Sequence, residues 1–117
     1  EPLGPREPME AMVIAPCTGN TLAKLANGVT DTAVTMAAKA HLRNGRPLVI
    51  AVSTNDGLSG SAENIGKLLN RRNVYFVPFR QDDAAKKPRS LQSDFGLIDQ
   101  TVEAALRGWQ IQPIIKG

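Results

Sequence analysis

The chain has 117 residues, 42% of them hydrophobic and 21% charged, a balance that excludes collagen-like, disordered and disulfide-scaffold proteins. This length suits one domain built around a single core. With 14 basic and 11 acidic residues the formal net charge is +3, which gives only a mild bias towards anionic ligands.

Several kinds of site and partner are disfavoured by the residues that the chain lacks. One cysteine, Cys17, cannot form an internal disulfide, and with a single histidine, His41, it leaves too few ligands for a metal site. No apolar run approaches the roughly 20 residues that span a bilayer, and no secretory signal is visible, so we expect a cytoplasmic protein without membrane contacts. The few aromatic residues are too dispersed to stack nucleic acid bases, so no nucleic acid partner is expected.

Residues 1–10 are interpreted as a linker or loop, because three prolines fall within the first eight positions. The chain begins with Glu1 instead of a methionine, which favours the later part of a longer protein, although processing would give the same pattern. We therefore expect residues 11–117 to form a partial α/β domain.

Three short apolar runs, rich in β-branched residues, predict strands at residues 12–15, 48–52 and 74–77. Their hydrophobicity is continuous and does not alternate with polar residues, which is typical of parallel strands covered on both faces. The sequence therefore predicts a three-layer α/β fold with a mostly parallel sheet, of the Rossmann-like or flavodoxin-like kind.

Helices are predicted in the segments that connect and follow these strands. Residues 21–27 and 32–44 have helical patterns, and Ser61 is a candidate N-cap for a third helix with its apolar residues on one face. A last helix is predicted at residues 97–107, followed by a peripheral extended tail at residues 109–112.

Loops that follow parallel strands emerge at one edge of the sheet, where open α/β proteins bind ligands. In this chain they are the polar segments 16–21, 53–57 and 79–83. We expect the first two to lie side by side and to share one pocket.

The first of these loops has the residues of an anion pocket. Gly19 allows the backbone to approach a ligand, and short donors at Thr18, Asn20 and Thr21 stand before or within a helix N-terminus. Alternatively, Asn20 or Thr21 caps the helix and no ligand is involved. The spacing matches neither a P-loop nor a dinucleotide-binding fingerprint.

Neither Cys17 nor His41 is interpreted as a catalytic residue. Cys17 precedes a predicted helix, where a thiolate is favoured, but no base accompanies it, so we expect a buried packing residue. His41 falls in the last turn of its helix, where a partly charged imidazole suits the helix dipole.

The second and third loops add further candidates. Ser53, Thr54 and Asn55 would complete a pocket of hydrogen-bond donors, although an Asn-Asp-Gly sequence forms a turn without any ligand. Lys86 and Lys87 either hold a dicarboxylate or phosphate, or are simply solvated.

Seven stretches together resemble the flavoprotein family, which contains the FMN-dependent cysteine decarboxylases, and within it the family of dipicolinate synthase B subunits. These stretches are residues 12–21, 35–40, 42–45, 51–56, 73–79, 81–82 and 86–88.

The resemblance implies a set of site residues. A flavin-contacting loop of Pro-Ser-Ala-Asn-Thr type corresponds to residues 16–21, in which Asn20 and Thr21 match and the residues between Pro16 and Asn20 depart. Of a second loop, Pro-Ala-Met-Asn, only Asn55 is retained, and loss of the methionine disfavours cysteine decarboxylation. The implied cofactor-binding residues are Pro16, Cys17, Thr18, Gly19, Asn20, Thr21, Ser53, Thr54 and Asn55, with Asn20 and Asn55 also catalytic and Lys86 and Lys87 substrate-binding.

The resemblance also implies a function. We expect an oxidoreductase subunit that works with the A subunit of dipicolinate synthase, which carries NAD(P), to form pyridine-2,6-dicarboxylate from a dihydrodipicolinate-type precursor. The setting implied is the cytoplasm of the mother cell of a sporulating bacterium, with FMN as a possible cofactor. Two alternatives are an FMN-dependent decarboxylase of the same family and a non-catalytic interaction subunit.

The family has a glycine-containing first strand-loop-helix unit before the part that this chain matches. Without that unit, the strand at residues 12–15 would have an unpaired apolar edge. The resemblance therefore also implies a homo-oligomer.

Overall fold

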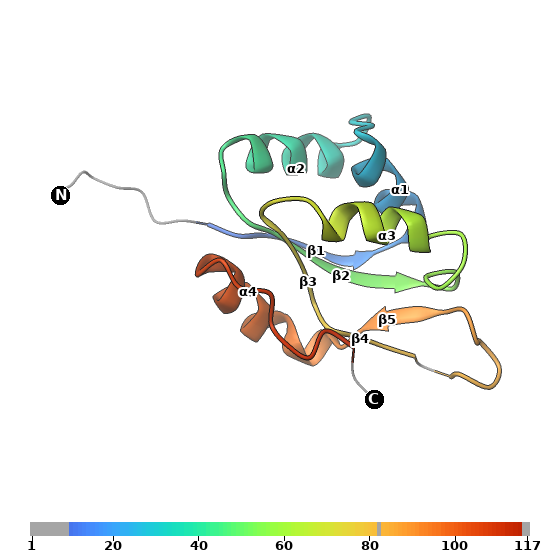
Figure 1. Ribbon diagram of the computed structural model, residues 1–117. Helices are drawn as coiled ribbons and strands as arrows, with labels where there is room; N and C mark the ends of the chain where they lie inside the picture. The colour runs from blue at the N-terminus through green and yellow to red at the C-terminus, as the bar shows by residue number, and fades with distance from the viewer. Residues whose placement is uncertain (1–9, 82, 116–117) are drawn as a thin grey trace.

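The computed structural model describes residues 10–81 and 83–115, which form an α/β fold with helices on both faces of a five-stranded sheet (Figure 1). Nearly all of the predicted linker at residues 1–10 lies outside the described residues. Among those described, no helix has the length and apolar character needed to cross a membrane.

The second strand is the centre of the sheet. The strands are β1 (Met12–Cys17), β2 (Leu48–Thr54), β3 (Val74–Phe76), β4 (Phe79–Arg80) and β5 (Leu91–Ser93). β1 runs parallel to β2 along one edge, and β3 runs parallel to the beginning of β2 along the other. The three predicted parallel strands are therefore confirmed.

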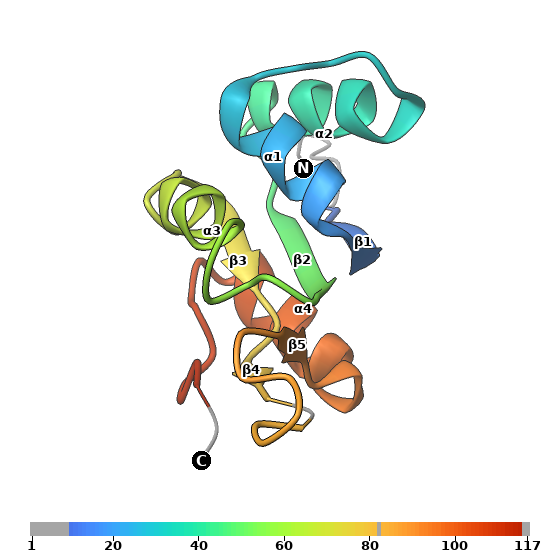
Figure 2. The same cartoon turned by 90° about the vertical axis from the view of Figure 1, so that its right-hand side faces the viewer.

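The sheet departs from the predicted parallel pattern at the far end of β2. There β5 pairs antiparallel with Ser53 and Thr54, and β4 pairs antiparallel with β5 (Figure 2). β3 ends at Phe76, so β5 occupies the place beside β2 that a longer third strand would have taken. The predicted loop at residues 79–83 was wrong in part, because Phe79 and Arg80 form β4.

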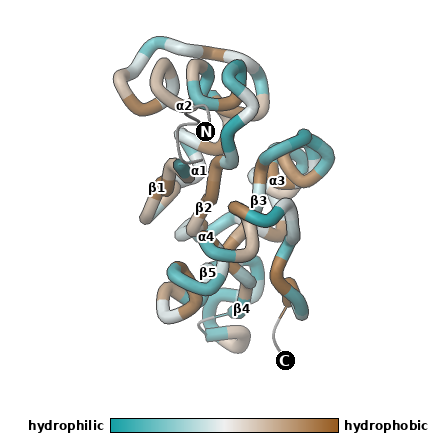
Figure 3. Tube along the Cα trace, turned by 90° about the vertical axis from the view of Figure 1, so that its left-hand side faces the viewer, coloured by the Kyte–Doolittle hydropathy of each residue, from teal (hydrophilic) through white to brown (hydrophobic). Residues whose placement is uncertain are grey.

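The helices cover both faces of the sheet, as predicted for three layers. Helices α1 (Gly19–Asn27), α2 (Ala33–Arg43) and α3 (Ala62–Leu69) lie on one face, and α4 (Ile98–Leu106) lies on the other. Side chains of β2 alternate between these layers: Leu48, Ile50 and Val52 pack in the larger core, and Val49 and Ala51 pack near α4. Figure 3 shows the hydrophobic character of β2. Burial on both faces explains its continuous hydrophobicity.

Two helix caps differ from the sequence interpretation. Thr18, and neither Asn20 nor Thr21, is the N-cap of α1, and its hydroxyl accepts a hydrogen bond from the Thr21 backbone N–H at 3.4 Å. Ser61 stands at the N-cap position of α3 as predicted, but its side chain makes no capping bond, because it donates to Asp56 instead.

The tail after α4 bonds to the sheet through the Ile114 carbonyl, which accepts from the Phe79 N–H at 2.7 Å, and through the Gln110 side chain. The Gln110 amide pairs with the Phe76 backbone, accepting from its N–H at 2.9 Å and donating to its carbonyl at 2.7 Å. It thereby satisfies backbone groups at the edge of β3 that no further strand covers.

One buried hydroxyl joins the antiparallel and parallel parts of the sheet. Ser93, 4% exposed, accepts from the Val52 backbone N–H at 2.8 Å and donates to the Val77 carbonyl at 2.9 Å. Both partners belong to buried residues. The hydroxyl therefore replaces the strand-to-strand hydrogen bonds that are missing at the point where β3 ends and β5 becomes the neighbour of β2.

We expect Ser93→Ala to lower the free energy of unfolding by about 1–3 kcal/mol, because two buried backbone groups lose their partner. Ser59→Ala is the matched control, since Ser59 is exposed and its hydroxyl donates only a long 3.4 Å bond to the Asp56 carbonyl. Urea denaturation of both variants measures the difference, and equal stabilities would refute the bridging role of Ser93.

Candidate functional site

The polar segments that follow β1 and β2 meet at one edge of the sheet. The strands run in parallel with Cys17 opposite Val52, so the chain leaves both at the same end. A methyl group added at Gly19 would lie 3.0 Å from Ser61 Oγ and 3.1 Å from Thr54 Oγ1. The first turn of α1 therefore packs directly on the end of β2 and on the segment that follows it, as the sequence predicted for these two loops.

Asp56 organises this junction. Its carboxylate oxygen Oδ1 accepts hydrogen bonds from Thr54 Oγ1 at 2.5 Å and from Ser61 Oγ at 2.8 Å. Its backbone carbonyl accepts from the N–H groups of Ser59 and Ser61. We call Gly19, Thr54, Asp56 and Ser61 the Asp56 cluster, because each of the other three packs against or bonds to this residue or its partners.

The hydrogen bonds from Thr54, and secondarily from Ser61, hold the pKa of Asp56 below its ordinary value. The carboxylate is therefore ionised at neutral pH, and both hydroxyls are oriented towards it. The Thr54 oxygen also accepts from the Asp56 N–H at 3.4 Å, so each hydroxyl oxygen keeps at least one lone pair to accept from a ligand. Within residues 10–81 and 83–115 no group of three His, Cys, Asp or Glu side chains is arranged to hold a metal ion.

Asn20 and Asn55 flank this cluster. Asn20 is in the first turn of α1, next to Gly19, and Asn55 lies between Thr54 and Asp56. Both side chains are exposed, and neither makes a hydrogen bond to another described residue. Their amide groups are thus free to bind a ligand at the same edge, although their catalytic role remains a prediction.

The other predicted residues of the first loop divide between core and surface. Cys17 is fully buried, and burial raises the pKa of its thiol to about 12. This confirms the interpretation of Cys17 as a packing residue, and it leaves only its backbone available to a cofactor. Pro16 belongs to β1, beyond the predicted strand end, and is exposed, as is Thr18. Thr21 is half-buried, and its hydroxyl lies 3.4 Å from that of Thr18.

In the second segment, Ser53 and Thr54 belong to β2 and not to the predicted loop. Ser53 is half-buried, and its hydroxyl accepts from the Gln92 side-chain amide at 3.4 Å. The antiparallel pairing of β5 thus places Gln92 beside the site. His41 lies in the last turn of α2 as predicted, with Nε2 2.9 Å from the Glu10 carbonyl oxygen.

The segment that contains Lys86 and Lys87 is hydrogen-bonded, at its C-terminal end, to the residue that follows the second loop. The Leu58 N–H donates to the Arg89 carbonyl at 2.9 Å. Asp83 closes the turn below the lysines, accepting from the Lys86 N–H at 3.2 Å. Both lysine side chains are exposed and make no ion pair within the described residues, so substrate binding by them stays a prediction.

The sequence interpretation missed Asp56, Ser61 and Gln92 as site residues. An Asn-Asp-Gly sequence indicates a turn by itself, and the Thr54 hydroxyl two residues before the carboxylate is the signal that could have identified a fixed aspartate. The Ser61 contact depends on the path of the 57–60 turn, and the Gln92 contact on the antiparallel β5, which no local pattern indicated.

We expect Asp56→Asn to weaken the pH dependence of stability. Because folding lowers the pKa of Asp56, its contribution is complete above about pH 4 and is lost as the pH falls through the folded value. The parent melting temperature should therefore fall more steeply as the pH drops below about 4 than that of Asp56→Asn. Asp99→Asn, at an exposed position of α4 without a hydrogen bond to another described side chain, is the control. If the melting temperatures of the parent and of Asp56→Asn change with pH in the same way, the hydrogen bonds of the Asp56 cluster do not stabilise the ionised carboxylate.

Comparisons with known proteins identify relatives over almost the whole chain. The model of the flavoprotein family matches residues 3–93. The B subunit of dipicolinate synthase from Bacillus subtilis (strain 168) is 51% identical over 115 residues, which cover 98% of this chain and 58% of the relative. The chain thus spans somewhat more than half the length of this curated relative.

The fold has a close counterpart among solved structures. The crystal structure of the dipicolinate synthase B subunit from Bacillus halodurans C superimposes with a TM-score of 0.91 at 49% identity, over 97% of this chain and 58% of that one. A flavin prenyltransferase UbiX from Methanothermobacter thermautotrophicus is 49% identical over 43 residues, which are 37% of this chain and 22% of the relative. The flavodoxin-like fold predicted from the sequence is confirmed by the solved relative.

Proposed function

The chain belongs to the flavoprotein family, and from its similarity to one branch of that family we propose that it acts as the B subunit of a dipicolinate synthase. It would serve with a nicotinamide-binding A subunit to form pyridine-2,6-dicarboxylate in a sporulating bacterium. The observation that carries this proposal is 51% identity to such a B subunit over 98% of the chain.

The proposed reaction removes two electrons and two protons from a dihydrodipicolinate-type ring: the nicotinamide of the A subunit would take up both electrons and one proton as a hydride, and the second proton would be released to solvent. In this scheme, the present chain binds and orients the dicarboxylate. The amide groups of Asn20 and Asn55 and the first N–H groups of α1 would donate to its carboxylates. Asp56 would act through Thr54 as a positioning residue, because its carboxylate oxygen is occupied by two hydroxyls.

Lys86 and Lys87 would add positive charge to this site. Both lie on the segment that ends beside the second loop, where the Arg89 carbonyl bonds to Leu58. An ammonium group in reach of a carboxylate favours a dianionic substrate over a neutral one.

The same residues alternatively fit a flavin, which would occupy this edge in place of the dicarboxylate. Thr18, Thr21 and Ser53 supply hydroxyls, and Asn20 and Asn55 supply amides, so the donor set is neutral and suits the polar atoms of an isoalloxazine ring and a ribityl chain. The N-terminus of α1 is the feature that would favour the phosphate of FMN. Bound FMN would supply two-electron redox chemistry. Similarity to a flavin prenyltransferase over 43 residues supports this part of the proposal.

Reconstitution with the A subunit tests the site. We expect Asn20→Ala and Asn55→Ala each to reduce the kcat/KM of dipicolinate formation by about tenfold or more, because each removes a donor to the charged substrate (about 1.5–3 kcal/mol). Asn70→Ala, at the exposed C-cap of α3, is the matched control and should retain parental activity.

Ultraviolet absorbance of the product follows the reaction, and gel filtration confirms that each variant still forms the two-component complex. Parental activity in Asn20→Ala and Asn55→Ala with the complex intact would make this a non-catalytic interaction subunit. Release of a yellow flavin on denaturation of the purified protein tests cofactor binding separately.

A further inference from the structure

Arg80 lies at the same edge of the sheet as the candidate site. Both β2 and β4 run antiparallel to β5, which lies between them, so β2 and β4 point in the same direction and end at the same edge. Arg80 is the last residue of β4, and Asn55 directly follows β2. The sheet therefore brings an arginine to the edge at which the dicarboxylate would bind.

Arg80, Gln92 and Ser53 form one row across these three strands. Gln92 is the register partner of both Ser53 and Arg80. Residues paired in this way project from the same face of a sheet, and adjacent strands are about 5 Å apart, so Ser53 and Arg80 are about 10 Å apart. The Gln92 amide donates to Ser53 Oγ at 3.4 Å and is therefore directed towards β2. The row thus has neutral polar groups at one end and a guanidinium at the other.

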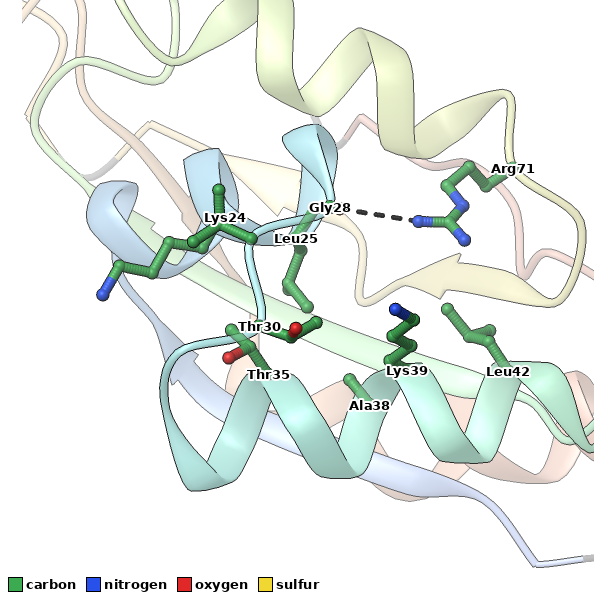
Figure 4. Close-up of a pocket in the computed structure, with 10 residues that line it drawn as sticks. Lys24, Leu25, Gly28, Thr30, Thr35, Ala38, Lys39, Leu42 and Arg71 are labelled. Atoms are coloured by element: carbon green, nitrogen blue, oxygen red, sulfur yellow. Dashed lines mark hydrogen bonds between the residues drawn. The ribbon is translucent and has the colours of Figure 1, made fainter.

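The guanidinium of Arg80 has no partner in the fold. Arg80 is exposed, and within residues 10–81 and 83–115 its side chain makes no hydrogen bond or ion pair. By contrast, the Arg71 guanidinium donates to the Leu25 carbonyl at 3.5 Å, which links the segment after α3 to α1 (Figure 4). Arg71 therefore supports the packing of the helices, whereas Arg80 is available to a ligand.

The backbone that carries Arg80 is held on both sides. Phe79 is buried in the larger core, and its ring centroid lies 5.3 Å from that of Phe76. On the outer side of β4, the Phe79 N–H donates to the Ile114 carbonyl at 2.7 Å. Charged residues often keep an open edge strand from pairing with another chain, but here the tail already covers this edge at Phe79. A fixed backbone and a covered edge favour a ligand-binding role for Arg80.

A rigid ring with two carboxylates needs two separate groups of donors. In the proposed function, Asn20 and Asn55 donate to one carboxylate, and the second would project away from them. A guanidinium presents a planar fork of N–H donors that binds a carboxylate in a bidentate manner. The ammonium groups of Lys86 and Lys87 add charge but lack this fork. Arg80 is therefore suited to the second carboxylate by its chemistry and by its distance from Ser53.

We propose that Arg80 binds the second carboxylate of the substrate and thereby makes the site selective for dicarboxylates. The inference rests on the proposed function, which supplies the substrate and the first carboxylate contact. Arg80 contributes binding and orientation and takes part in no covalent step. Because it would bind the carboxylate equally in the substrate and in the transition state, its loss should raise KM and leave kcat nearly unchanged.

Calorimetry of the purified protein with two ligands tests this role. The ligands are pyridine-2,6-dicarboxylate and pyridine-2-carboxylate, which lacks the second carboxylate, and displacement titrations measure the weaker one. We expect Arg80→Gln to raise the Kd of the dicarboxylate by about tenfold or more and to change that of the monocarboxylate by less than about twofold. Arg80→Lys should lie between parent and Arg80→Gln, since it keeps the charge but loses the fork.

Arg72→Gln is the matched control. It makes the same charge change at an exposed position shortly before β3, at the opposite end of the sheet, so both dissociation constants should stay within about twofold of the parent values. Melting curves check that all variants fold.

Dipicolinate formation with the A subunit separates failure of this proposal from failure of the proposed function. There Arg80→Gln should raise KM by about tenfold with kcat within about twofold of the parent. Parental selectivity in Arg80→Gln, or an equal loss of affinity for both ligands, in a chain that still supports product formation would overturn the role of Arg80 and leave the proposed function intact. A parent chain that binds neither ligand and supports no product formation would overturn both.

Discussion

The structure depends on the burial of β2 on both faces and along both edges. Its first five residues, Leu48–Val52, are fully buried, and their alternating side chains form the cores on either side of the sheet. A strand of this kind needs helices above and below it and a neighbour on each side to satisfy its backbone. β1 supplies one edge, whereas β3 and then β5 supply the other.

The position of the candidate site follows from this arrangement. Polar residues begin where the buried part of β2 ends, at the same level as the N-terminus of α1. Gly19 allows the close approach, because a larger residue would meet the hydroxyls of Thr54 and Ser61. Asp56 then fixes those hydroxyls, so the edge that faces a ligand is held in one arrangement.

Local sequence patterns predicted most of the fold and part of the site. Continuous apolar runs identified β1, β2 and β3, and parallel topology then placed Asn20 and Asn55 at a common edge. The two-residue β4 and the three-residue β5 carry too little periodic signal to be recognised, and their antiparallel pairing depends on contacts remote in sequence. For the same reason the contribution of Gln92 and the bridging role of Ser93 were not predictable from their neighbours. The proposed function was inferred from the family resemblance, because no acid–base pair or metal motif recognised in the sequence indicated a reaction.

The idea on which the proposed function depends is that the ends of β1 and β2 form one binding site. Titration of the isotopically labelled protein with pyridine-2,6-dicarboxylate, followed by nuclear magnetic resonance, tests it most directly. The side-chain amide signals of Asn20 and Asn55 should shift together and give the same Kd, with the Asn70 signal as an unaffected reference. Movement of only one of the two amides, or two different dissociation constants, would show that these residues do not share a site.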